Sequence, residues 1–220
     1  MAYFFVGEII MIKKYVVGPI QENCYIVAHG NKCIVIDPGS EADYLIKEIE
    51  KEDLKVSGIF ITHGHYDHIG AANELRDHFH TKIYASHDTK DMMENTDENL
   101  SIMIGGEEYK VNEPVEELKV SNEGADNIIE DFKIVVYSTP GHAKGSCLFY
   151  LEEDHALFTG DTLFMNGCGR IDFPTGNQFQ MMKSLFRIKS FSFDADVYPG
   201  HGPNTTLSNE KKNNPYLNIK

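Results

Sequence analysis

Three histidines and an aspartate crowd into six positions of the segment FITHGHYDHIG, residues 60–70. His63, His65, Asp67 and His68 follow a run of apolar and β-branched residues, which predicts a buried strand, and they lead into a helical pattern. Imidazole nitrogens and carboxylate oxygens are the ligands that zinc-like divalent cations bind. His63 and His65 can point to one side of an extended segment, while Asp67 and His68 can turn toward a second point. The cluster can therefore serve two neighbouring metal ions.

Three further ligand candidates lie at the ends of other predicted strands: His142 in TPGHAKG, Asp161 in FTGDTLF and His201 in YPGHGP. A loop beyond a rigid strand holds such a side chain in place without a long linker. A single HxH pair is as often surface or capping histidines as a metal site. HxHxDH followed by three Gly-His or Gly-Asp loops is far more specific, and it favours metal binding. The other histidines are expected to be solvated or locally bonded.

Strands and helices alternate along the chain that must position these residues. Hairpins are predicted at 24–39 and 146–161, single strands at 56–62, 82–86, 132–138 and 194–199, and helices at 40–54, 68–79 and 177–188. Ser40 is placed to cap the first helix. Hairpins beside helical crossovers favour a mixed α/β sandwich over a purely parallel sheet.

Two segments contribute less to this pattern. Residues 87–130 are rich in Asp, Glu and Asn, with Gly and Pro breaking any long element, and predict a connection with little core of its own that could act as a flap. Residues 1–11 are expected to be an N-terminal extension or an edge strand, since Met11 could serve as an alternative start. Residues 12–220 are expected to form a single domain.

Composition excludes several classes of function. The chain has 220 residues and a formal charge of −14, which argues against nucleic acid and anionic membrane as partners. The N-terminus lacks the basic region of a signal peptide, and no stretch approaches the ~18 apolar residues of a membrane span. The four cysteines show no CxxC pair and no disulfide density, so a reducing cytoplasm is expected. The oligomeric state is expected to be a monomer or a small homo-oligomer.

The order HxHxDH, Gly-His, Gly-Asp and Gly-His resembles the metallo-β-lactamase superfamily, over about residues 12–216. The segments TGDTLFMNGCGR and YPGHGPNTTLSNEKKNNPYL resemble the compact glyoxalase II-like (hydroxyacylglutathione hydrolase-like) hydrolases more closely. The resemblance implies a four-layer αββα sandwich of two mixed β-sheets flanked by helices, with the metals at one edge. It argues against a β-lactamase with a thiolate ligand, because Asp161 stands where that branch has Cys and His68 follows the motif aspartate.

The resemblance also implies a ligand set for two divalent metal ions, zinc first, with iron or manganese as alternatives. It assigns one ion to His63, His65 and His142, the other to Asp67, His68 and His201, and the bridge between them to Asp161. Two such ions, two carboxylates and one hydroxide sum to a charge of +1. A bridging hydroxide attacking a carbonyl is hydrolytic chemistry, in which Asp67 and Asp161 are the expected catalytic residues.

An acyl thioester such as S-lactoylglutathione is the expected substrate, because a thiol with a pKa of ~8.5 can leave as thiolate without a general acid. Arg170 in GCGRIDF lies where the resembled hydrolases contact an anionic substrate, and a salt bridge to Asp172 is the alternative role. Asp37 is expected to bond a ligand histidine, with a turn-forming role as the alternative. Cys168 is expected to pack in its loop, since no free histidine could act as its base.

Other features leave alternatives open. Asp172 and Pro203 stand where glyoxalase II enzymes present tyrosines to the substrate. The helical segment with which those enzymes hold glutathione does not follow NNPYL in this sequence. Both differences predict weak discrimination for the glutathione part of a substrate. Persulfide dioxygenases share the scaffold and a GCGR.DF-like segment, but bind one iron through two histidines and an aspartate. A lactonase on the same metal centre is a further alternative. A non-catalytic metal scaffold is disfavoured, because no ligand position is lost.

Overall fold

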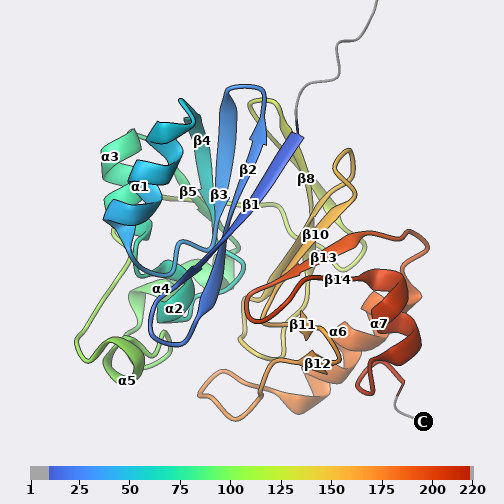
Figure 1. Ribbon diagram of the computed structural model, residues 1–220. Coiled ribbons are helices and arrows are strands. Elements are labelled where there is room, and N and C mark those ends of the chain that lie inside the picture. The colour runs from blue at the N-terminus through green and yellow to red at the C-terminus, as the bar shows by residue number, and fades with distance from the viewer. Residues whose placement is uncertain (1–9, 219–220) are drawn as a thin grey trace, which may run out of the picture.

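Two six-stranded sheets face each other in the computed structural model, which describes residues 10–218 (Figure 1). The first sheet has the order β1-β2-β3-β4-β5-β6 and contains β1 (Ile10–Val17), β2 (Glu22–His29), β3 (Lys32–Ile36), β4 (Lys55–Phe60), β5 (Ile83–Ala85) and β6 (Val115–Glu117). Strands β1 to β3 pair antiparallel through tight turns, whereas β3 to β6 run parallel. Parallel neighbours need a crossover, and helices supply each one.

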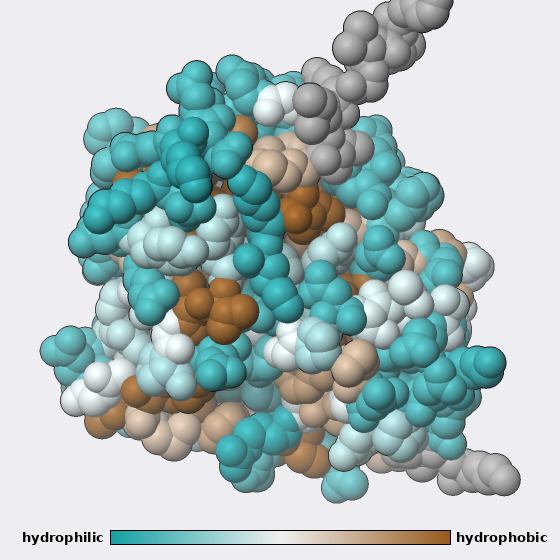
Figure 2. Space-filling model, viewed as in Figure 1, coloured by the Kyte–Doolittle hydropathy of each residue, from teal (hydrophilic) through white to brown (hydrophobic). Residues whose placement is uncertain are grey.

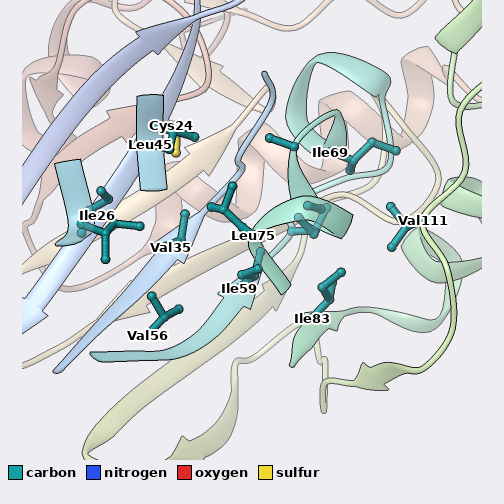
Figure 3. Packing of buried hydrophobic residues seen from close by; sticks show 14 of the residues in the cluster. Cys24, Ile26, Val35, Leu45, Val56, Ile59, Ile69, Leu75, Ile83 and Val111 are labelled. Atoms are coloured by element: carbon teal, nitrogen blue, oxygen red, sulfur yellow. The ribbon is translucent and has the colours of Figure 1, made fainter. Parts of the chain in front are cut away.

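The helices in the first half of the chain cover the outer face of this sheet and the edge that lies lowest in Figure 1. They are α1 (Ala42–Lys51), α2 (Tyr66–Ile69), α3 (Ala72–Phe79), α4 (His87–Glu94) and α5 (Ser101–Gly105). Leu45 of α1 and Leu75 of α3 pack with Ile26, Val35 and Ile59 of the sheet in one buried cluster (Figure 3). The helix at 40–54 was thus correctly predicted from its apolar spacing.

The second sheet has the order β14-β13-β10-β9-β8-β7. Its strands are β7 (Ala125–Ile129), β8 (Phe132–Ser138), β9 (Cys147–Leu151), β10 (Ala156–Gly160), β13 (Asp196–Pro199) and β14 (Thr205–Thr206), with a separate ribbon of β11 (Leu163–Phe164) and β12 (Gly167–Cys168). Among the described strands of this second sheet, only the β10–β13 pair is parallel, and α6 (Gln178–Ser190) makes the crossover between these two strands. Helix α7 (Leu207–Asn213) follows β14.

Three buried clusters separate four layers. Strand residues alternate between two faces, so Ile26 packs on the helices while Val27 packs on the other sheet. The middle cluster joins Val27 and Phe60 of the first sheet to Phe149 and Phe158 of the second. The third cluster joins the outer face of the second sheet to α6 and α7. The expected four-layer αββα sandwich of two mixed sheets is therefore confirmed.

Two details near the first helices differ from expectation. Ser40 does not cap α1, because Glu41 adopts a left-handed conformation with φ 58° and takes the cap position without a side-chain bond. The helix predicted at 68–79 is split into α2 and α3 at Gly70. There the backbone of Gly39 lies so close that a Cβ on Gly70 would overlap its carbonyl oxygen, and Ala71 N–H donates to Pro38 O at 2.9 Å.

The segment 87–130 is more ordered than expected. It forms α4, α5, β6 and β7, and its side chains Met93, Val111 and Val115 join the buried cluster between the first sheet and its helices. Short elements interrupted by acidic residues hide this core from a periodicity argument. The expectation of little core is therefore wrong, whereas the role as a flap stays a prediction.

Residues 1–9 of the predicted N-terminal extension lie outside the described residues. Strand β1 begins at Ile10 and pairs with β2 at the edge of the first sheet. The division into residues 1–11 and a domain of residues 12–220 stays a prediction. Within residues 10–218, no helix combines the length and apolar character needed to cross a membrane, and the longest has 13 residues.

Candidate metal centre

The seven predicted ligands meet at one edge of the sandwich, beyond the ends of four strands. His63, His65, Asp67 and His68 follow β4 and enter α2, while His142, Asp161 and His201 follow β8, β10 and β13. Both sheets contribute, and a backbone bond from Asn23 N–H to Gly200 O at 2.7 Å joins them beside the site. The strand-end argument therefore placed all seven side chains in one region.

His63, His65 and His142 form the first group, and their ring nitrogens face one another. His65 Nδ1 lies 3.1 Å from His63 Nε2 and 2.9 Å from His142 Nε2. His142 Nδ1 lies 2.7 Å from the carbonyl oxygen of Arg170, to which it must donate its proton. The Nε2 atom of His142 therefore presents a lone pair to the group.

The same reasoning applies to His63. Thr62 Oγ1 donates to Asp37 Oδ2 at 2.6 Å, so it accepts from His63 Nδ1 at 3.1 Å, and His63 Nε2 also carries a lone pair. One proton on His65 Nδ1 can satisfy only one of the two lone pairs that face it. A cation between the three nitrogens satisfies both, with His65 Nδ1 as the third donor.

Asp67, His68 and His201 form the second group. His201 Nε2 lies 3.1 Å and His68 Nε2 3.4 Å from Asp67 Oδ2. His68 Nδ1 donates to Asp37 Oδ2 at 3.0 Å, and His201 Nδ1 donates to Gln21 O at 3.3 Å. In the neutral rings both Nε2 atoms therefore direct lone pairs at a carboxylate, an arrangement that a proton or a metal cation between them would stabilise.

Asp161 lies between the two groups. Its Oδ2 is 3.6 Å from His142 Nε2 of the first group and 3.7 Å from His201 Nε2 of the second, and its Oδ1 is 3.4 Å from His68 Nε2. Among residues 10–218, the buried atoms Asp161 Oδ1 and His68 Nε2 have no hydrogen-bond partner. Donor atoms that are buried, convergent and unsatisfied fit a metal ion, because unpaired buried polar atoms are rare in folded proteins.

Burial acts to lower the pKa of His63, His65 and His68, and neighbouring carboxylates outweigh it at one of them. It lowers the pKa of His65 to about 3 and that of His63 well below its usual value, so both remain neutral, the form that binds metal. At His68, burial also acts to lower the pKa, but Asp67 and Asp161 outweigh it and raise the pKa well above its usual value. The second group is therefore a strongly cation-attracting position.

Comparison with known proteins agrees with this geometry. A family model described as "Metallo-beta-lactamase superfamily" matches residues 17–201. The chain belongs to the metallo-beta-lactamase superfamily. This confirms the expected family and, at the level of class, the expected metallo-hydrolase.

Relatives and solved structures in this superfamily are similar along nearly the whole chain. "Probable metallo-hydrolase YqgX" of Bacillus subtilis (strain 168) is 33% identical over 94% of this chain and 97% of its own, and "Hydroxyacylglutathione hydrolase GloC" of Haemophilus influenzae (strain ATCC 51907 / DSM 11121 / KW20 / Rd) is 34% identical over 93% and 96%. The crystal structure of BLEG-1 B3 metallo-beta-lactamase has a TM-score of 0.88 at 32% identity, covering 95% and 100%. The crystal structure of TTHA1623 in a di-iron-bound form has a TM-score of 0.82 at 33% identity, and the match covers 93% of this chain and 99% of that chain.

Two glycines lie directly beside the predicted metal ligands, where a larger residue would not fit. A Cβ on Gly200 would overlap Asp161 Oδ1 and the His68 ring, and a Cβ on Gly169 would overlap the backbone of Asp161 and crowd the His142 ring. The glycines of PGHGP and GCGR therefore allow backbone to approach the ligands closely.

Two residues flagged in the sequence lie beside the centre with defined partners. Asp37 accepts from Thr62 N–H at 2.7 Å, from the Thr62 hydroxyl and from His68 Nδ1, so the expected bond to a predicted ligand histidine is present. Arg170 faces the cleft but is engaged by Asp172 through two bonds of 2.7 and 2.6 Å and lies over the Phe173 ring. The salt-bridge alternative for Arg170 is thus realised.

Glu22 was missed by sequence reasoning. Its carboxyl group is fully buried behind the second group, 3.7 Å from His68 Nδ1, and neither oxygen has a hydrogen-bond partner among the described residues. Burial raises its pKa well above the usual range, which favours the neutral acid. The available signal was one acid at the start of ENCYIVAH, a strand whose centre is apolar.

Proposed function

We propose that this protein is a dinuclear metal hydrolase that cleaves thioesters, with S-lactoylglutathione or a related acyl thioester as substrate. The observation that carries the proposal is the pair of ligand groups joined by Asp161. Two divalent ions held there, zinc first, would supply hydroxide near neutral pH and polarise a carbonyl. Likeness to a hydroxyacylglutathione hydrolase supports the choice of bond.

The residues around the centre favour a leaving group that needs no proton. His65, Asp67, His142, Asp161 and His201 line the cleft, so the reacting atoms would lie against them. The other described lining residues include no carboxylic acid and no histidine. A thiolate departs without a general acid, whereas an amine does not. Asp67, whose carboxylate faces the cleft, would accept a hydrogen bond from the attacking oxygen and orient it.

Arg170 has a conditional role in this proposal. Its guanidinium lines the cleft, and Asp172 neutralises it. A substrate carboxylate would have to compete with Asp172 for the same donors. The expected preference for anionic thioesters therefore depends on how readily that pair opens.

Hydrolysis by protein loaded with defined metals tests the proposal. We expect turnover of S-lactoylglutathione and of simple acyl thioesters to rise with metal content and to level off near two ions per chain. Protein that holds two ions and hydrolyses no thioester on any thiol carrier would contradict it. Penicillin and a lactone, assayed in parallel, test the alternatives of lactam and lactone hydrolysis, the first because of the likeness to BLEG-1.

A persulfide dioxygenase with a single iron is the second candidate. His65 Nδ1, His142 Nε2 and Asp161 Oδ2 lie together, with 2.9 and 3.6 Å between neighbours, and could hold one ion through two histidines and a carboxylate. Iron is also present in the similar protein TTHA1623, although as a di-iron centre. One iron per chain with oxygen uptake on a persulfide would favour this candidate, whereas about two ions and no oxygen uptake would favour the hydrolase.

A further inference from the structure

The cleft over the metal centre has a polar floor and apolar walls. Its volume is about 670 Å³, within the range of small-molecule sites. Five predicted metal ligands form the floor, and the rest of the lining consists of Pro19, Ile20, Leu100, Met103, Ile104, Phe164, Cys168, Arg170 and Phe173. Figure 2 shows hydrophobic side chains gathered over α5, at the lower left of the molecule. Apart from Arg170 and the Cys168 thiol, these walls offer no polar side chain.

The α5 wall is built into the fold. Asn99 is fully buried, and its side-chain amide donates to the carbonyl oxygens of Met93 at 3.2 Å and Tyr109 at 2.8 Å, while its oxygen accepts from Ser101 N–H at 2.9 Å. Asn99 O also accepts from Tyr66 N–H at 2.7 Å, between two ligands of the HxHxDH motif. Hydrogen bonds of Asn99 therefore connect α5 to the loop that carries the HxHxDH motif and position the helix relative to the predicted metal ligands.

Close packing and backbone conformation fix the helix further. Gly105 lies so near the Tyr66 ring that a Cβ there would stand 2.6 Å from a ring carbon. Leu100 and Gly106, which flank α5, both have left-handed backbone, with φ of 63° and 83°. Met103 is nevertheless 61% exposed, so an apolar side chain is held out into the cleft with little protein around it. Contact with an apolar part of a ligand would remove this side chain from water, which is favourable.

Resting on the thioesterase function proposed above, we propose that this cleft selects its substrate by an apolar acyl group, which lies against Met103 and Ile104 of α5 and Ile20 of the loop between β1 and β2. Cellular thiol carriers bear amides, carboxylates or phosphates, so the acyl group is the part of a thioester that can be apolar. A carrier carboxylate finds one guanidinium in the cleft, which Asp172 already engages. Aliphatic or aromatic acyl groups should therefore be preferred to lactoyl.

An acyl series on one neutral thiol tests the inference. Acetyl, butanoyl, hexanoyl and benzoyl thioesters of N-acetylcysteamine keep the leaving group constant. Each methylene buried against the wall should raise kcat/KM about threefold, so hexanoyl should exceed acetyl by a factor on the order of 10². Hexanoate should also bind more tightly than acetate in calorimetry, a measurement that requires no turnover.

Met103→Ser and Ile102→Ser form a matched pair. Both residues lie on α5 and are at least half exposed, but only Met103 lines the cleft. Met103→Ser should lower the ratio of kcat/KM for hexanoyl to kcat/KM for acetyl roughly three- to tenfold. Ile102→Ser should not change this ratio by more than about twofold.

The outcomes separate the inference from the proposed function. Thioester hydrolysis with no dependence on acyl length, or with lactoyl preferred to hexanoyl, would overturn the acyl selection and leave the hydrolase intact. No hydrolysis of any thioester would overturn the hydrolase, and the comparison of hexanoate with acetate would still decide whether the wall binds an apolar chain. Equal losses in the Met103 and Ile102 variants would show that α5 acts only through folding.

Discussion

Replacing Asp37 with Asn should weaken metal binding although Asp37 is not a predicted ligand. Asp37 Oδ2 accepts from both the Thr62 hydroxyl and His68 Nδ1, and Oδ1 accepts from Thr62 N–H. Its backbone has φ 51°, a conformation that asparagine tolerates well, so the substitution changes charge and donors with little backbone strain. The variant therefore tests the carboxylate itself.

Asparagine cannot reproduce this pattern in either orientation. If its NH₂ group takes the place of Oδ2, it faces His68 Nδ1, and His68 must move its proton to Nε2, the nitrogen that faces Asp67 and Asp161. If the amide is flipped, the NH₂ group faces Thr62 N–H at 2.7 Å, donor against donor. Outer partners of metal ligands are typically worth 10- to 100-fold in affinity, or about 1.4–2.7 kcal/mol. We expect a loss of that size for the weaker of the two ions.

Competition with a chelator of known affinity measures this loss. Asp43→Asn is the control, because it removes the same charge from an exposed position on α1. The melting temperature of the metal-free variant shows whether the fold has changed. If Asp37→Asn binds both ions as tightly as the control while its metal-free stability is intact, the argument from the His68 tautomer is refuted.

Other substitutions and metal removal give further expected outcomes. Asp161→Asn should leave less than two ions per chain by metal analysis and lower turnover more than 10-fold, and full occupancy at an unchanged rate would exclude a bridge. Gly200→Ala should lose metal because its Cβ overlaps the ligands, whereas Gly167→Ala, where the nearest atom is 3.8 Å away, should retain it. Arg170→Ala should raise KM for an anionic thioester without changing metal content. Asp172→Ala should lower that KM, because it frees the guanidinium. If these variants change only thermal stability, Arg170 is a structural residue. Metal-free protein should regain about 2.7 kcal/mol of stability when zinc is present at 100 times its dissociation constant, as a shift in melting temperature that an excess of chelator reverses.

Local patterns were sufficient to predict a mixed α/β sandwich and the gathering of the seven side chains at strand ends. Apolar runs ending in Gly-His or Gly-Asp mark strand ends, and strand ends in a sandwich gather at its edges. The family resemblance then fixed the layer order, which hairpins and crossovers alone leave open. The metal roles of His63, Asp67 and Asp161 are still predictions, although their geometry is compatible with them.

Tertiary partners were beyond the reach of the same patterns. Glu22 begins β2, and its burial depends on segments distant in the sequence, which include Gly39, His68 and the loop after β13. The apolar wall of α5 escaped notice because a helix of five residues is too short to show a period, and its acidic neighbours suggested a loop. The salt bridge between Arg170 and Asp172 was named from the sequence only as one of two alternatives, because spacing in a loop does not determine which partner the guanidinium takes.

The division of the ligands between the two sheets has a consequence for the timing of metal uptake. During synthesis His63 and His65 leave the ribosome together, but His142 completes their group much later, and Asp67 and His68 wait longer still for His201. Until then each group offers two ligands on a mobile chain, from which an ion exchanges readily. On the proposed ligand assignment, capture would become tight only when the second sheet docks on the first. The ion that the protein retains would then be selected by the cell's metal pool at the moment of docking and by the rigid edge that docking creates, rather than by the first ion that the nascent chain meets.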